Sequence, residues 1–130
     1  MLKVLLIDDD DDDRFFFKKA LQRIEQPVEY LQADGCHAAF DLIKENVTPD
    51  IIFLDINMPE ENGYTCLSIL QKNIDWNHIP VIIYTTSGST NDVEKALEIN
   101  ATGYLKKPDN IQALSKNIEL LLSRLKNNSI

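Results

Sequence analysis

Two patterns of apolar and polar positions alternate along the chain. Short runs of apolar or β-branched residues predict five β-strands. These strands cover residues 3–7, 28–33, 50–54, 81–84 and 103–105. Because most of the runs are nearly continuous in apolar residues, we expect a parallel sheet that is buried on both faces.

Between and after these runs, apolar residues recur at helical spacing. The pattern predicts helices at residues 14–24, 35–45, 64–74, about 90–100 and about 111–126. Ile74 is expected to face inward in the third helix, and Val93, Ala96 and Leu97 in the fourth. The chain therefore repeats a strand–helix unit from one end to the other.

These units are joined by short connections, and no linker interrupts them. Right-handed crossovers between parallel strands place helices on both faces of the sheet. We predict a doubly wound α/β fold with a five-stranded parallel sheet. It would be one domain over residues 1–130, with a core of about residues 2–126 and no output domain.

The predicted strands end in polar residues of several kinds. Asp8 and Asp9 follow the first strand, Asp55 the third, Thr85 the fourth and Lys107 the fifth. The carboxyl ends of the strands of an open parallel sheet form the edge where ligands bind. Three carboxylates, a hydroxyl and an ammonium at one edge indicate a site for a divalent cation and a phosphoryl group.

The chemistry of these groups favours metal binding and phosphoryl transfer. Carboxylates that lie close together repel each other, and such a cluster is kept where it binds a cation. Hard oxygen ligands suit Mg²⁺, and the backbone carbonyl of Asn57 is placed to add one more oxygen. An ionised Asp55 can also act as a nucleophile. Lys107 and Thr85 would then bind the transferred phosphoryl oxygens.

Each of these residues also has an ordinary structural explanation. Residues 10–12 suit a solvated acidic loop, and Asp12 or Asp13 suits the cap of the following helix. The acid pair after the first strand fits a loop as well as a site. An aspartate at a strand end, a threonine in a strand and a lysine in a loop are ordinary taken alone, and Tyr104 suits the core. The functional interpretation rests on their order and joint placement.

Composition and charge narrow the classes of function. Asp and Glu outnumber Lys and Arg by 21 to 13, and the net charge of −8 argues against nucleic-acid binding. No apolar run reaches the roughly 20 residues that cross a membrane, and the N-terminus shows no secretory signal. We therefore expect a cytoplasmic protein that binds neither nucleic acid nor membrane.

The cysteines and histidines lack the spacing of metal ligands. Cys36 and Cys66 are expected to pack as reduced, small apolar residues rather than to form a disulfide. His37 and His78 are expected to be surface or packing residues. Neither residue type therefore predicts a metal site.

Four stretches of the chain, in this order, resemble the receiver domain of two-component response regulators. They are residues 6–9 with the acid pair, residues 55–59 followed by Gly63, residues 80–85 and residues 101–108. The resemblance covers essentially the whole chain and implies a flavodoxin-like fold with strand order 2-1-3-4-5. It also implies a signalling switch, which catalyses only its own phosphoryl transfer and dephosphorylation.

The resemblance assigns the phosphoacceptor, the donor and the cofactor. Asp55 would accept a phosphoryl group from a phosphohistidine on a histidine kinase or a histidine phosphotransfer protein. The cofactor would be Mg²⁺. Its implied ligands are Asp8, Asp9, Asp55 and the backbone carbonyl of Asn57.

The remaining residues would bind the phosphoryl group and respond to it. Lys107 would be the phosphate-binding lysine, because the family's lysine directly precedes a proline, here Pro108. This bond is often cis in relatives. Thr85 and Tyr104 would be the switch pair, with the Thr85 hydroxyl drawn to the phosphoryl group and Tyr104 turning inward. The reshaped face would bind an unknown protein effector, in a monomer or a phosphorylation-dependent dimer.

Two features depart from the family's pattern. Thr86 is larger than the very small residue that usually follows the switch threonine, and it flanks the site together with Ser87. It is expected to restrict access to the acyl phosphate or the closure of the loop. The acids of residues 10–13 add negative charge, which would raise metal affinity or slow an anionic donor.

Three other functions would use some of the same residues. A Mg²⁺-dependent phosphohydrolase of the haloacid dehalogenase type would use residues 8–10, but the acids that follow do not supply its hydroxyl or valine. A phosphorylation-independent interaction module with the receiver fold would not need Asp55, Thr85 and Lys107 together. In a flavodoxin the acid run would repel the flavin phosphate.

Overall fold

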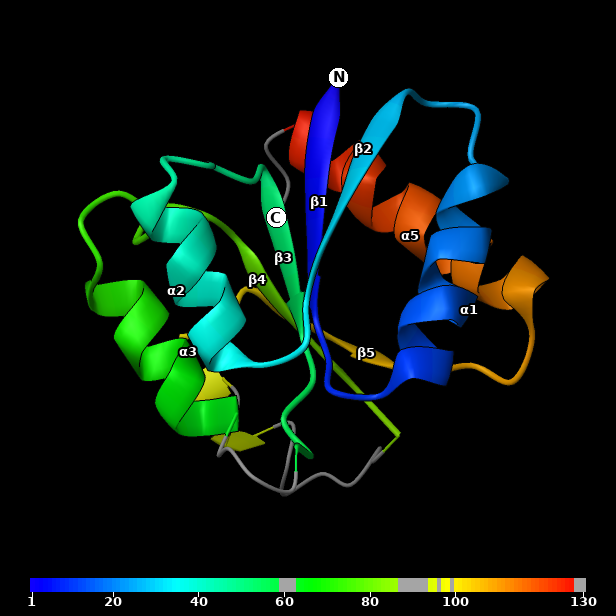
Figure 1. The fold of residues 1–130 in the computed structure, drawn as a ribbon. Coiled ribbons are helices and arrows are strands. Elements are labelled where there is room, and N and C mark those ends of the chain that lie inside the picture. The colour runs from blue at the N-terminus through cyan, green and yellow to red at the C-terminus, as the bar shows by residue number, and fades with distance from the viewer. Residues whose placement is uncertain (59–62, 87–93, 96, 99, 128–130) are drawn as a thin grey trace.

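The computed structural model describes residues 1–58, 63–86, 94–95, 97–98 and 100–127. In this part of the chain, five parallel strands form one sheet in the order β2-β1-β3-β4-β5 (Figure 1). The strands are β1 (Leu2–Ile7), β2 (Val28–Ala33), β3 (Ile51–Leu54), β4 (Val81–Thr85) and β5 (Gly103–Lys106). The helices are α1 (Asp11–Gln22), α2 (Cys36–Lys44), α3 (Gly63–Lys72) and α5 (Ile111–Lys126). The predicted doubly wound fold and its strand order are confirmed.

The helices cover both faces of the sheet. Helices α2 and α3 lie on one face, and α1 and α5 lie on the other (Figure 1). Successive residues of β1 point to opposite faces, so Leu5 and Ile7 pack toward α2 and α3, and Val4 and Leu6 pack toward α1 and α5. This two-sided burial explains the continuous apolar runs. None of the described helices is long and apolar enough to span a bilayer.

Helix α1 begins earlier than the predicted start at residue 14. Its N-cap is Asp10, whose carboxylate accepts a hydrogen bond from the backbone N–H of Asp13 at 2.9 Å. The acids of the first turn, residues 11–13, lie at the positive end of the helix dipole and favour this early start. The prediction that Asp12 or Asp13 caps the helix is therefore wrong.

Helix α3 ends earlier than predicted. Its last residue is Lys72, so Ile74 lies beyond the helix and is 82% exposed. The prediction that Ile74 faces inward is wrong, because the apolar spacing continues past the end of the helix. Trp76 is the buried residue of this segment, and its indole N–H donates to the carbonyl of Val47 at 3.2 Å.

Leu97 also differs from its prediction. It is helical but 55% exposed, so the expected inward orientation is wrong. The neighbouring helical residues that the structure describes, Glu94, Lys95 and Glu98, are exposed as well. The other two residues expected to face inward here, Val93 and Ala96, lie outside the described residues.

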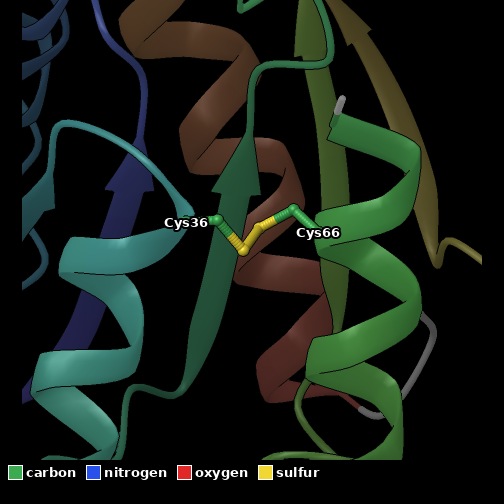
Figure 2. The surroundings of a disulfide bond; sticks show 2 residues. All are labelled: Cys36 and Cys66. Carbon is green, nitrogen blue, oxygen red and sulfur yellow. A yellow bond between two sulfur atoms is a disulfide. The ribbon is translucent and has the colours of Figure 1, made fainter. Parts of the chain in front are cut away.

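A disulfide joins α2 to α3 (Figure 2). Cys36 is the first residue of α2, and Cys66 lies in the first turn of α3. Their Cα atoms are 5.8 Å apart, within the usual range for a disulfide. The prediction of two separate reduced thiols is wrong. The cysteines are 30 residues apart, and only the packing of the two helices on one face brings them together.

Candidate functional site

The predicted site residues lie at the carboxyl ends of the strands, where further backbone hydrogen bonds extend the sheet. The N–H of Asp55 donates to the carbonyl of Ile7 on the neighbouring strand at 2.9 Å. The N–H of Asp8 donates to the last residue of β2 at 3.0 Å, and that of Lys107 to the carbonyl of Thr85 at 2.7 Å. These bonds hold the residues just past the strands in register with one another.

Three carboxylates meet at this edge. Asp8, Asp9 and Asp55 each offer an oxygen, and these oxygens lie within 4.8 Å of one another. Asp8 and Asp55 are buried, whereas Asp9 is exposed. The backbone N–H of Asn57 donates to Asp55 at 2.9 Å, and that of Asp10 donates to Asp8 at 3.0 Å. Both buried carboxylates are thus oriented by the loops that follow their strands.

Lys107 places an ammonium among the carboxylates. Its Nζ lies 2.7 Å from a carboxylate oxygen of Asp13, 2.8 Å from one of Asp8 and 3.4 Å from one of Asp55. The Nζ also lies 5.1 Å from the centre of the Tyr84 ring. Burial disfavours the charged amine, but hydrogen bonds to Asp13 and Asp8 outweigh this effect and raise the pKa of Lys107 above its usual value. The lysine is therefore held in its charged form.

The environment favours the charged form of Lys107 but disfavours the charged forms of Asp8 and Asp9. Burial raises the pKa of Asp8 to about 6, although hydrogen bonds from Lys107 and the Asp10 backbone favour the ionised form. Partial burial and the negative charge of Asp55 raise the pKa of Asp9. Burial and mutual repulsion thus make the ionised carboxylates of this cluster unfavourable. A bound cation would stabilise them by compensating their negative charge.

The hydroxyl of Thr85 is linked to the loop after Asp55. Thr85 is fully buried, and its Oγ1 accepts a hydrogen bond from the side-chain amide of Asn57 at 2.5 Å. The sequence predicts a role only for the backbone carbonyl of Asn57. The hydrogen bond between its side chain and Thr85 is therefore not predicted from the sequence. The carbonyl of Asn57 as a metal ligand stays a prediction.

A cavity of about 310 Å³ opens beside the phosphoacceptor candidate. It is lined by Asp9, Asp10, Asp13, Asp55, Asn57, Thr86 and Lys107. Thr86 thus lines the same cavity as Asp55, and its effect on access to this space stays a prediction. A second cavity of about 320 Å³ lies near the amino end of β4, and the described residues that line it include Gln71 and His78 but no acid.

The remaining predicted residues lie around the site or outside the described residues. Tyr104 in β5 packs partly buried against the α2–α3 side of the core, with its hydroxyl buried. Pro108 is half-buried, and the Lys107–Pro108 bond is trans, like every other peptide bond in the described part of the chain. It is therefore not the cis bond that is frequent in relatives. Ser87 lies outside the described residues.

Gly63 positions the residue that follows Asp55. A Cβ atom on Gly63 would lie 2.4 Å from the Cα of Ile56 and 3.0 Å from the carbonyl oxygen of Asp55. Only glycine permits so close an approach. The first turn of α3 therefore packs directly against the backbone of the candidate nucleophile.

Asp13 is the main site residue that the sequence does not predict. From the sequence it is a candidate helix cap and one of the acids that add negative charge, yet it forms the shortest of the three contacts of the Lys107 ammonium with carboxylates. The signal that indicates its role is the unbroken run of acids over residues 8–13. Once α1 is known to start at Asp11, Asp13 lies in its first turn, close in sequence to the acid pair.

The donor set fits a hard divalent cation. Carboxylate oxygens are the ligands that Mg²⁺ prefers, and it keeps several waters besides. Asp8, Asp9 and Asp55 supply such oxygens at mutually short distances. Among the described residues, no cysteine or histidine takes part in this group. The chemistry of the residues present therefore fits Mg²⁺ or Mn²⁺ rather than a softer metal.

The strand order, with acids, a hydroxyl and a lysine at the carboxyl ends of the strands, defines an α/β domain with a candidate cation site at this edge. The family described as the response regulator receiver domain matches residues 4–119, and the chain belongs to this family. Receiver domains are signalling switches of two-component systems rather than classical enzymes, and histidine kinases phosphorylate response regulators. They bind Mg²⁺ or Mn²⁺ in an acidic pocket.

Individual relatives resemble the chain over nearly its whole length. The chemotaxis protein CheY1 of Helicobacter pylori is 29% identical over 121 residues, which cover 93% of this chain and 97% of that protein. The Mn²⁺-bound structure of response regulator Rcp1 has a TM-score of 0.79 at 28% identity, covering 95% of this chain and 93% of that one. Response regulator RPA3017 in red light signaling of R. palustris has a TM-score of 0.85 at 25% identity, with the same coverages of 95% and 93%.

Proposed function

We propose that this receiver domain accepts a phosphoryl group on Asp55 from a phosphohistidine of a histidine kinase or a histidine phosphotransfer protein. One observation carries the proposal: the Asp55 carboxylate meets two other carboxylates within 4.8 Å and a lysine ammonium at 3.4 Å. One acid is thus available for modification, two for a cation and one ammonium for the phosphoryl oxygens.

The proposed ligands of Mg²⁺ are Asp8, Asp9, Asp55 and the backbone carbonyl of Asn57. The similar response regulator Rcp1 has a Mn²⁺-bound form, which supports the binding of a divalent cation by this domain. When bound, the cation would supply positive charge to the phosphoryl oxygens. It would also relieve the repulsion from Asp55, which adds to the effect of partial burial in raising the pKa of Asp9.

The transfer is an exchange of one bond to phosphorus for another. A carboxylate oxygen of Asp55 forms a bond to phosphorus while the bond from phosphorus to the donor's imidazole nitrogen breaks, and the electron pair leaves with that nitrogen. The ammonium of Lys107 would balance the charge of the phosphoryl oxygens. In a separate step, water would attack phosphorus while the bond from phosphorus to the Asp55 oxygen breaks, which releases inorganic phosphate and restores the carboxylate. The protein would thus turn over only its own acyl phosphate.

The response to phosphorylation would begin at Thr85. Its hydroxyl oxygen accepts a hydrogen bond from Asn57 in the unmodified protein, and its own proton would donate to a phosphoryl oxygen on Asp55. Such a differential contact shifts an existing equilibrium between two states. Tyr104 would move from its partly buried position against the core, and the changed face would bind a protein effector. The protein would act as a monomer or a phosphorylation-dependent dimer.

Labelling with a small donor tests the proposal. Acetyl phosphate or phosphoramidate with Mg²⁺ should add one phosphoryl group to the wild type and none to Asp55→Asn, as measured by intact mass. Asn keeps the shape of the side chain but lacks the nucleophilic carboxylate. Labelling of Asp55→Asn at the wild-type rate would contradict the proposal.

A further inference from the structure

The ammonium of Lys107 contacts a carboxylate that the proposed function does not use. Its contact to Asp13 at 2.7 Å is shorter than those to Asp8 at 2.8 Å and Asp55 at 3.4 Å. An ammonium has three N–H donors, and three carboxylates accept from this one. In the unmodified protein its donors are therefore in use, and the phosphoacceptor holds the most distant of the three contacts.

The turn that begins α1 fixes the position of Asp13. Its backbone N–H donates to the side chain of Asp10 at 2.9 Å, and the backbone N–H of Asp10 donates to the side chain of Asp8 at 3.0 Å. The guanidinium of Arg14, the next residue, donates to the carbonyl of Asp8 at 2.7 Å. These bonds tie the first turn of α1 to the end of β1. The contact of Asp13 with Lys107 is therefore part of an ordered network.

The three acceptors differ in their access to water. The side chain of Asp13 is 39% exposed, whereas those of Asp8 and Asp55 are 0% and 8% exposed. A carboxylate that loses its ammonium partner must be rehydrated, and this costs least where water already reaches it. Lys107 can therefore give up Asp13 more easily than it can give up either buried partner.

We propose that Asp13 is a positioning residue for Lys107, which holds the ammonium in the unmodified protein and competes for it with the phosphoryl group on Asp55. The inference rests on the proposed function. A new phosphoryl group needs an N–H from Lys107, and the contact with Asp13 is the one released. Asp13 thus limits how readily Asp55 is phosphorylated and how firmly the phosphoryl group is held.

Beryllium fluoride with saturating Mg²⁺ is a suitable probe, because it forms a phosphoryl-like group on an aspartate without a transfer step. We expect Asp13→Asn to bind it about twofold to tenfold more tightly than the wild type, the range of a partly exposed ion pair. Calorimetry measures this affinity. With phosphoramidate, the donor concentration that gives half the maximal labelling rate should fall in the same sense.

Asp12→Asn is the matched control. Asp12 lies in the same first turn of α1, is exposed, and carries the same charge. Its removal changes the net charge equally but leaves Lys107 and its partners in place, so we expect an affinity close to that of the wild type. Asp13→Glu keeps a carboxylate at the contact and should restore most of the wild-type affinity.

A double-mutant cycle separates competition for Lys107 from any other effect of Asp13. In a Lys107→Met background, Asp13→Asn should change the affinity for beryllium fluoride no more than Asp12→Asn does. Thermal unfolding without the probe shows whether each variant is folded, and Asp13→Ser replaces Asp13→Asn if the latter is not.

The outcomes distinguish this inference from the proposed function. If Asp13→Asn binds the probe no more tightly than Asp12→Asn, or gains as much without Lys107, the competition does not exist. If the wild type neither binds beryllium fluoride nor accepts a phosphoryl group, the proposed function itself is wrong.

Discussion

Lys107 and the carboxylates around it decide how the unmodified site behaves. The ammonium contacts Asp8, Asp13 and Asp55 within 3.4 Å and compensates part of their negative charge. Burial works against ionisation of Asp8 at the same time, and it raises the pKa of this carboxyl to about 6. The carboxylates of the site are therefore under electrostatic strain, which binding of Mg²⁺ would relieve.

Neutralising Asp8 should stabilise the metal-free protein. Its pKa is raised from 3.8 to about 6, so between these values the folded state binds more protons than the unfolded state. The free energy of unfolding attributable to Asp8 therefore falls as the pH rises through this range. We expect Asp8→Asn to raise the free energy of unfolding at neutral pH by about 1–2 kcal/mol. Urea denaturation with a chelator present measures it.

The pH dependence supplies the control for this prediction. Below both pKa values Asp8 is protonated in the folded and the unfolded state, so the advantage of Asp8→Asn should disappear in acid. Asp12→Asn, at an exposed position of α1, should show little advantage at any pH. A variant Asp8→Asn that is less stable than the wild type at neutral pH would contradict the assignment of strain to this carboxylate.

Among the elements, α2 and α3 are joined covalently beside the site. The disulfide from Cys36 to Cys66 closes a loop with a sequence separation of 30 residues. Closing such a loop restricts the unfolded chain and stabilises the folded one by about 3–4 kcal/mol. We expect a reductant to lower the free energy of unfolding by this amount, as measured by urea denaturation with and without dithiothreitol.

The control is a protein that lacks both sulfurs. The double variant Cys36→Ala and Cys66→Ala should show the lowered stability already and should not respond to dithiothreitol. If reductant leaves the unfolding of the wild type unchanged while thiol titration shows the bond broken, the bridge does not stabilise this pair of helices.

Helix α3 also restrains the backbone directly after Asp55 through Gly63. A methyl group there would lie 2.4 Å from the Cα of Ile56, which cannot move without displacing the backbone next to Asp55. We expect Gly63→Ala to lower the free energy of unfolding by about 1–3 kcal/mol and to slow labelling of Asp55. Urea denaturation and phosphoramidate labelling measure the two effects.

Gly103→Ala is the comparison for this change. Among the described residues, a methyl group at Gly103 would meet only the Cδ1 of Ile82, at 3.0 Å, and that side-chain end can shift. Its effect on stability should be smaller, and labelling should stay near the wild-type rate. Equal effects of both substitutions on labelling would show that the contact of Gly63 with the loop has no special role.

For the molecule as a whole, the sheet is predictable because it is buried on both faces. The predicted bounds of β2 agree with the structure, and each of the other strands differs from its prediction by one residue at one end. The order of the strands, in contrast, comes from the family resemblance, because apolar runs do not say which strands are neighbours. Helix ends are less predictable, since the apolar spacing continues past the end of α3 to Ile74.

The site is predictable as far as it follows from the strand ends. Residues directly after parallel strands must share one edge, and this places Asp8, Asp55 and Lys107 together. The contact of Asp13 with Lys107, the hydrogen bond from Asn57 to Thr85 and the disulfide depend on how helices and loops pack. Periodicity carries no information on such contacts between distant segments.

Localising the acyl phosphate tests the central claim most directly. Borohydride reduces an aspartyl phosphate to homoserine, which peptide mass spectrometry assigns to a position. After phosphoramidate treatment with Mg²⁺, we predict homoserine at position 55 alone, and none when a chelator replaces Mg²⁺. Homoserine at position 8 or 9, or an equal yield at position 55 with and without Mg²⁺, would contradict the account of one phosphoacceptor served by a metal-binding acid pair.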